Sequence, residues 1–374
     1  MAVNVDVNFI QNPGLKPGDI VRVREKSEIL KTLDQSGALE GMPFMTEMLR
    51  YCGQEFKVYK RADKTCDTVN RTGGRRLFDT VHLEDLRCDG SGHGGCEASC
   101  LLFWKEAWLQ KESRDVGQLP LLSRVPSSLK KRYLSERNQC SEETLSNMSK
   151  RVEENGEGGE YIFYCQLTEI PKSTLPLKWW DPRQYFRELA GGNITLSDLL
   201  RGMVFSLYRK FVYFGRGYSL KIRLYNAIQS KSGRIPWPYK DGELDKTPVG
   251  QLDLQEGELV RVKSYDAILE TLSKSNRNRG LRFDAEMVPY CGKEFRVRKR
   301  VKKIIEESTG KLIEFPTPSI ILDGVVCLSC YSHTRMFCPR SIYPFWREIW
   351  LERVPNQTVS PTEMTDDRLG RNQS

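Results

Sequence analysis

The stretch Tyr51-Cys-Gly-Gln-Glu-Phe-Lys-Val-Tyr-Lys-Arg61 returns 239 residues later as Tyr290-Cys-Gly-Lys-Glu-Phe-Arg-Val-Arg-Lys-Arg300. The similarity extends back without a gap to Gly18 and its counterpart Gly257, and about half of the paired residues are identical. Self-similarity at one fixed offset indicates that a segment has been duplicated within the chain. The sequence therefore predicts two homologous modules, which decides the architecture of the protein.

Within each copy, apolar and charged residues nearly alternate, as at Ile20, Val21 and Val23 and again at Phe56 and Val58. This period is typical of strands that bury one face. Short strands separated by tight turns favour a small, strongly bent barrel. We therefore predict the fold class α+β, with two small SH3-like β-barrel modules joined by a linker and a small helical centre.

The segments around the modules differ in composition. Residues 112–160 are rich in Ser, Lys, Glu, Asn and Gly, which is typical of a polar linker. In the centre, Asp181-Pro182 and Ser197-Asp198 are start signals for two helices, and the apolar residues of the second helix fall at helical spacing, which predicts a core face. The predicted boundaries are a polar tail at 1–17, module A at 18–111, the linker at 112–160, a mainly helical centre at 161–256, module B at 257–354 and a polar tail at 355–374.

Each module contains a short loop with three cysteines and one histidine. The spacing is Cys-x4-His-x2-Cys-x3-Cys in the first loop and Cys-x2-Cys-x2-His-x4-Cys in the second. Zn²⁺ tolerates the swapped order, because it needs four nitrogen or sulfur donors and no fixed sequence of them. The predicted ligands are Cys88, His93, Cys96 and Cys100 in the first loop and Cys327, Cys330, His333 and Cys338 in the second.

This ligand set predicts two structural zinc ions. A closed four-ligand site has no open position for water or substrate, which favours stabilisation of a small barrel over catalysis. Two alternatives stay open. An iron-sulfur cluster is the main one, since thiolates suit it too. A catalytic site with three ligands would result if one residue of a loop were not bound to the metal.

Several other conspicuous residues are more simply explained by packing. Cys52 and Cys291 stand next to turn glycines, and such cysteines are more often small core residues than nucleophiles. Tryptophans repeat at a four-residue spacing beside the metal loops, which favours core packing over a surface that stacks bases or grips a peptide. These are Trp104 and Trp108 in the first copy and Trp346 and Trp350 in the second. Cys66 and His82 are not matched by a cysteine or histidine in the second copy. They could add to the first metal site, but we expect ordinary structural roles for them.

Composition limits the classes of protein. Of the 374 residues, 39% are hydrophobic and 29% are charged, as in globular proteins, and no apolar run is long enough to span a bilayer. We therefore expect no integral membrane association. The N-terminus lacks the pattern of a secretory signal, and the odd number of 11 cysteines, several of them clustered with histidines, fits a reducing compartment. We predict a cytoplasmic protein.

The net charge of +9 is compatible with binding to polyanions, although it arises from well-mixed charges. Basic residues on the strands could track phosphates, and a solvated strand face explains them equally well. The candidates are Lys60, Arg61, Lys299 and Arg300. Trp179 and Trp180 stand at a junction between a loop and a helix, where they could anchor a ligand or partner or pack the central helices onto a barrel.

Several of these motifs together resemble a group of bacterial proteins to which no activity is assigned. They are Gly18-Asp-Ile-Val-Arg-Val23, Tyr51-Cys-Gly53, the Cys/His loop with Phe103-Trp-Lys-Glu-Ala-Trp-Leu109, and Trp179-Trp-Asp-Pro-Arg-Gln-Tyr185. The resemblance implies no function. The segment Gly-Asp-x-Val-Arg-Val is also similar, more distantly, to the opening strand of SH3-like barrels, which supports the fold prediction alone.

Two similar modules on one chain suit bivalent capture of a partner. We therefore predict a zinc-binding protein without chemistry of its own, a binding or accessory protein whose partner is a nucleic acid or another protein, with its oligomeric state left open. The alternative is an enzyme or accessory factor of a bacterial biosynthetic pathway, with a site between the modules around Asp181, Arg183 and Tyr185. If the modules are independent, loss of Cys88 or Cys327 should unfold only its own module.

Overall fold

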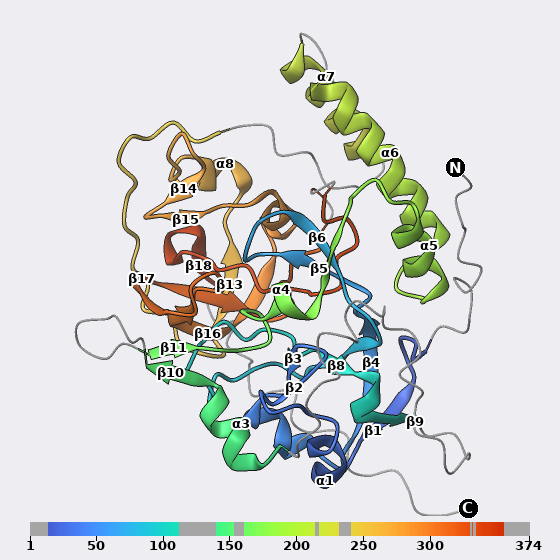
Figure 1. Ribbon diagram of the computed structural model, residues 1–374. Helices are drawn as coiled ribbons and strands as arrows, with labels where there is room; N and C mark the ends of the chain where they lie inside the picture. Colours follow the sequence, from blue (N-terminus) through green and yellow to red (C-terminus); the bar gives the residue numbers. More distant parts are fainter. Residues whose placement is uncertain are drawn as a thin grey trace, which may run out of the picture.

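The computed structural model describes residues 14–111, 140–152, 161–213, 217–231, 241–329, 331 and 334–354. It is a mixed α/β structure in which several small sheets make up the body, and helices α6 (Leu196–Tyr213) and α7 (Tyr218–Lys231) project from that body (Figure 1). None of the helices in these ranges is long and apolar enough to cross a membrane.

The first repeat is built on a five-stranded antiparallel half-barrel with the strand order β8-β7-β4-β1-β9. Its strands are β1 (Ile20–Val23), β4 (Glu55–Arg61), β7 (Thr80–Leu83), β8 (Trp104–Lys105) and β9 (Leu109–Lys111). Between them lie α1 (Lys26–Leu30), β2 (Ala38–Leu39), β3 (Met42–Pro43), η2 (Thr46–Tyr51), β5 (Lys64–Asp67), β6 (Gly73–Arg76) and η3 (Glu106–Trp108). Val21 and Val23 are buried and Ile20 is exposed, as the alternating pattern of β1 predicts.

The second repeat has a four-stranded sheet with the order β17-β16-β13-β18. Its elements are β13 (Leu259–Val262), α8 (Tyr265–Leu269), β14 (Arg277–Asn278), β15 (Leu281–Arg282), η4 (Ala285–Tyr290), β16 (Glu294–Ile305), β17 (Leu312–Leu322), η5 (Glu348–Trp350) and β18 (Leu351–Arg353). Strands β16 and β17 form one long hairpin. In the first repeat, β4 and β5 occupy the position of β16, and β6 and β7 occupy the position of β17. The duplicated sequence thus folds twice into one pattern, while closure of each sheet into an SH3-like barrel stays a prediction.

The repeated tryptophans form the centres of the two cores, which confirms the packing interpretation. All four are fully buried, namely Trp104, Trp108, Trp346 and Trp350. The indole of Trp108 donates to Thr32 Oγ1 at 3.1 Å, and that of Trp350 donates to the equivalent Thr271 Oγ1 at 2.9 Å. Because both rings are enclosed, they offer no stacking surface to bases or peptides.

Cys52, Cys291 and His82 also have packing roles. The two cysteines pack at the edges of the cores, and burial raises the pKa of both, that of Cys291 to about 12. A thiol with a raised pKa is a poor nucleophile at neutral pH. His82 is fully buried, with Nδ1 2.8 Å from the carbonyl oxygen of Leu102, and burial lowers its pKa to about 3, so it stays neutral.

The segment between the repeats contains more ordered structure than its composition indicates. Its elements are α3 (Glu142–Met148), β10 (Lys150–Val152), β11 (Tyr161–Phe163), α4 (Ile170–Ser173), β12 (Leu175–Leu177), α5 (Arg183–Ala190), α6 and α7. Residues 140–152 of the predicted linker are ordered, and Leu145 of α3 is buried in the core of the first repeat. Strand β12 pairs with β6 and extends the β5-β6 hairpin. The other linker residues, 112–139 and 153–160, and the tail at 355–374 lie outside the described residues.

The two repeats contact each other through equivalent residues. Thr68 and Glu307, which are counterparts at the offset of 239, hydrogen-bond to each other. In the first loop, Cys96 Sγ accepts from the backbone N–H of Ile305 in the second repeat at 3.3 Å, and in the second loop Cys338 contacts Cys66, the counterpart of Ile305. Each loop therefore packs on the hairpin of the other repeat, as expected for two copies related by an approximate two-fold axis.

Candidate metal centre

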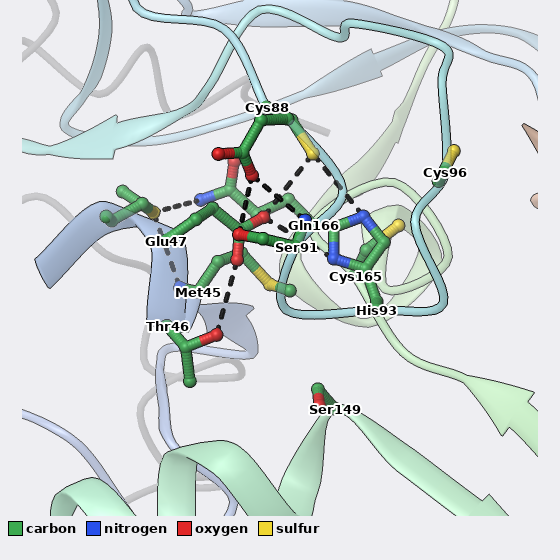
Figure 2. Close-up of polar contacts among 12 residues, drawn as sticks. Met45, Thr46, Glu47, Cys88, Ser91, His93, Cys96, Ser149, Cys165 and Gln166 are labelled. Carbon is green, nitrogen blue, oxygen red and sulfur yellow. Dashed lines mark hydrogen bonds and ion pairs between the residues drawn. The ribbon is translucent and has the colours of Figure 1, made fainter.

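Three buried groups meet at the first loop. Cys88 begins the loop after β7, His93 lies at the tip of the loop, and Glu47 belongs to η2. Cys88 Sγ is 3.4 Å from His93 Nε2 and 3.4 Å from Glu47 Oε1 (Figure 2). In a tetrahedral zinc site, bonds of 2.0 to 2.3 Å place a nitrogen and a sulfur ligand about 3.5 Å apart. Glu47, Cys88 and His93 thus form a group that could hold a metal ion.

Glu47 is well placed to orient the imidazole. His93 is 2% exposed, its Nδ1 lies 3.4 Å from Glu47 Oε1, and this nitrogen has no hydrogen-bond partner. A metal-bound histidine commonly turns its other nitrogen toward a carboxylate, which sets its tautomer and ring orientation. The orphaned buried nitrogen is therefore explained if Nε2 binds a metal and Nδ1–H approaches Glu47.

Sequence reasoning missed Glu47, although a signal was available. The motif Phe-x-x-Glu-Met occurs at Phe44–Met48 and again at Phe283–Met287, and both of its glutamates, Glu47 and Glu286, are buried. A buried acid is costly unless it is paired or faces a cation. A glutamate repeated between apolar residues of both modules therefore indicates a partner in each of them.

A small cavity lies directly beside this group. Its volume is about 30 Å³, roughly the share of one water molecule and about a tenth of the smallest ordinary ligand pockets. Five thiol or imidazole side chains line it, namely Cys88, His93, Cys96, Cys100 and Cys165. All four predicted ligands of the first loop thus line one cavity, together with Cys165, which the loop does not contain. Of the four, only Cys88 and His93 come close enough together to share an ion, with Glu47 as the third member of the group.

Burial keeps the donors around the cavity neutral unless a cation compensates their charge. Burial raises the pKa of Cys88, Cys96 and Cys100 and lowers the pKa of His93, because the charged forms lose hydration. The pKa of Cys88 is raised further by the nearby carboxylate of Glu47. Buried thiols of this kind are stable either as neutral groups or as thiolates around a metal that compensates their charge.

The shape of the first loop depends on Gly90. Its φ of +77° is in the left-handed region, and its carbonyl accepts hydrogen bonds from the N–H groups of His93 and Gly95. A Cβ atom at this position would lie 2.1 Å from the carbonyl oxygen of Cys96. Only glycine therefore allows the tight turn that brings His93 back over Cys88.

The structure describes the second loop in part, and the described residues are arranged like their counterparts in the first loop. Cys327 N donates to Ile342 O at 2.7 Å, as Cys88 N donates to Cys100 O at 2.8 Å, so Ile342 stands where the first loop has a cysteine. Glu286 acts electrostatically on Cys327, as Glu47 does on Cys88. Cys338 is buried, whereas the predicted ligands Cys330 and His333 lie outside the described residues.

The residues of the predicted enzyme site form a local structure at the start of α5. Asp181 accepts from the backbone N–H of Arg183 at 3.0 Å and from its guanidinium at 2.8 to 3.1 Å. The hydroxyl of Tyr185 donates to the carbonyl oxygen of Trp179 at 2.7 Å. Trp180 is 60% exposed. Asp181 and Arg183 thus neutralise each other at the start of α5.

The predicted phosphate-binding residues are largely engaged within the protein. Arg61 is 3% exposed and pairs with Asp63 and Glu106 at 2.9 and 2.7 Å. Arg300 pairs with Asp253 at 2.7 Å. Lys60 stacks over the ring of Tyr59 at 5.0 Å, and Lys299 is half-buried. Because Arg61 is enclosed and neutralised, and Arg300 is paired, these two side chains are poorly placed to track phosphates.

Helix α6 exposes an apolar stripe that was predicted to face a core. Its five large side chains are between 52% and 66% exposed, which shows that the prediction was wrong for them. They are Leu200, Met203, Val204, Leu207 and Phe211. The base of α6 rests on the second loop, since a Cβ atom at Gly202 would lie 2.4 Å from the ring of Phe337. An exposed apolar stripe of this extent is typical of an interaction surface.

Comparison of the chain with protein families, with curated proteins and with solved structures finds no match.

Proposed function

We propose that this is a zinc-binding protein without catalytic activity, in which the metal stabilises the two repeats and the protein acts by binding a partner. The small cavity lined by thiols and an imidazole, with the buried Glu47, Cys88 and His93 at one side, carries this proposal. Sulfur and imidazole donors around so small a space favour a structural ion. The same proposal includes two ions per chain, SH3-like repeats and a cytoplasmic location. A reducing compartment such as the cytoplasm keeps the cysteines available as thiolate ligands.

The metal content of the purified protein tests this function. We expect two zinc ions per chain by elemental analysis and a colourless protein, because Zn²⁺ has a filled d shell. Replacement by Co²⁺ should produce charge-transfer absorption from thiolate ligands. Protein without bound metal would refute the proposal, and iron with visible absorption would show that the loops hold an iron-sulfur cluster.

The partner that we propose is a protein with an apolar surface bordered by acidic side chains. The stripe on α6 supplies the apolar part, and Leu220 and Leu224 of α7 are also more than 60% exposed. The segment 196–231 contains one acidic residue against seven basic ones, and Arg201 and Arg223 are exposed on it. This charge disfavours pairing with a second copy and favours an acidic partner.

Site-specific photo-crosslinking in cells tests the partner. A photoreactive amino acid at Met203 should form an adduct with a protein segment rich in apolar and acidic residues. The same group at Ile20, which is exposed on the first repeat, is the matched control and should give no such adduct. Replacement of both Arg201 and Arg223 by Glu should abolish the adduct, because it reverses the charge beside the apolar stripe. Crosslinking of Met203 to a second copy, to lipid or to nucleic acid would contradict the proposal.

A further inference from the structure

Cys165 reaches the first metal cavity from the central segment. It follows β11 in the chain, and Figure 2 shows it next to His93. It lines the cavity together with the predicted ligands Cys88, His93 and Cys100. Cys100 and Cys165 are the thiols that act most strongly on Cys88 electrostatically. Cys96 is turned toward the second repeat, where its sulfur accepts from Ile305 N–H. Cys165 therefore faces the same cavity as the loop ligands, whereas Cys96 also contacts the second repeat.

Cys165 is enclosed like the loop cysteines. Burial raises the pKa of Cys165 to about 12, as it raises the pKa of Cys88, Cys96 and Cys100, and the neighbouring N–H groups of Thr168 and Leu167 oppose this shift only in part. A thiolate at Cys165 therefore needs a cation beside it, as the loop thiolates do.

Cys66 is related to the second loop by an independent contact. It lies on β5 of the first repeat and is 4% exposed. The neighbouring thiol of Cys338 lowers the pKa of Cys66 to about 6, while the pKa of Cys338 itself is raised, and Cys66 acts electrostatically on Cys327. The guanidinium of Arg340 points at its sulfur, with Nη1 3.6 Å from Sγ. Cysteines from two different repeats thus gather at one buried point.

We propose that each metal site takes one ligand from outside its own loop, Cys165 of the central segment at the first site and Cys66 of the first repeat at the second. The proposal rests on the metal-binding function proposed above. At the first site the four donors are then Cys88, His93, Cys100 and Cys165, since Cys96 is turned toward Ile305. At the second site, Cys66 joins Cys327 and Cys338, the loop cysteines that the structure describes there. Each bound metal then ties distant parts of the chain together.

Substitution of single cysteines tests the proposal. Cys165→Ser and Cys66→Ser should each lose about half of the zinc of the wild-type protein, because one of two sites loses a ligand. Cys52→Ser and Cys291→Ser are matched controls, since these partly buried cysteines lie at the core edges, and they should keep all of it. Cys165→His should retain the metal, because imidazole is also a zinc ligand, and its Co²⁺ form should show less thiolate charge-transfer absorption.

A direct measurement covers the case in which the serine variants do not fold. In wild-type protein loaded with ¹¹³Cd²⁺ and labelled at cysteine, the β protons of Cys165 and Cys66 should show scalar coupling to the metal. Absence of that coupling, or unchanged zinc content in folded Cys165→Ser and Cys66→Ser, would overturn the proposal while leaving the metal-binding function intact. A disulfide between Cys66 and Cys338 in metal-loaded protein would overturn it for the second site. Wild-type protein without metal would instead refute the function itself.

Discussion

Chelation of the bound metal is expected to unfold both repeats in one cooperative transition. Structural zinc contributes roughly 10 to 16 kcal/mol in small zinc-dependent peptides, whereas whole domains are stable by roughly 5 to 15 kcal/mol. Each loop packs on the hairpin of the other repeat, as the contacts of Cys96 with Ile305 and of Cys338 with Cys66 show. Loss of one loop therefore removes support from both cores.

Circular dichroism measures this outcome. Near-ultraviolet bands of the buried tryptophans should disappear together on chelation, and Cys88→Ser and Cys327→Ser should each lower the melting temperature of the whole chain in a single step. Cys52→Ser, which leaves the metal loops unchanged, is the control and should melt like the wild type. Two separate transitions, with one repeat intact, would show that the modules fold independently, as the sequence alone indicates.

Replacement of Arg340 by Met is expected to lower the free energy of unfolding more than replacement of any other charged residue at the interface between the repeats. Arg340 is 2% exposed, its Nη2 donates to Glu307 Oε1 at 2.5 Å, and its Nη1 donates to Thr68 Oγ1 at 2.9 Å. Arg340→Met leaves the carboxylate of Glu307 without its cation. Breaking a buried pair from one side lowers the free energy of unfolding by about 3 to 5 kcal/mol.

Urea unfolding of matched variants separates this effect from ordinary surface electrostatics. Arg298→Met removes an ion pair of 3.0 Å with Asp323. The two side chains are 43% and 47% exposed, so this change should lower the free energy of unfolding by less than about 1 kcal/mol. The double variant Arg340→Met with Glu307→Gln should recover much of the loss, because the uncompensated charge is removed. If Arg340→Met costs no more than Arg298→Met, Arg340 does not join the repeats energetically.

Local patterns were sufficient to predict the repeated order of elements and the approach of Cys88 and His93 in the first loop. Alternation places Val21 and Val23 in the core, and the spacing of Cys88, His93 and Cys100 brings them around one cavity. Both features depend on residues close together in the chain. Glu47 was within reach as well, because its motif repeats in the second module.

Features that depend on tertiary contacts could not be predicted in this way. Cys165 and Cys66 lie far along the chain from the loops that they approach, and only the packing of the segments brings them there. Helical spacing shows that α6 has an apolar face, but it does not show whether another part of the chain covers that face. Composition likewise missed α3, because one buried residue, Leu145, is enough to attach a polar segment to the core.

The contact between Thr68 and Glu307 has an evolutionary consequence. An ancestral chain with a single repeat could form a homodimer by the same exchange of loop and hairpin, with this position on the symmetry axis. Fusion of two such genes makes the association intramolecular and independent of protein concentration. After fusion, the sequences of the two halves can diverge. The first repeat carries Cys66 where the second has Ile305, and Cys100 where the second has Ile342.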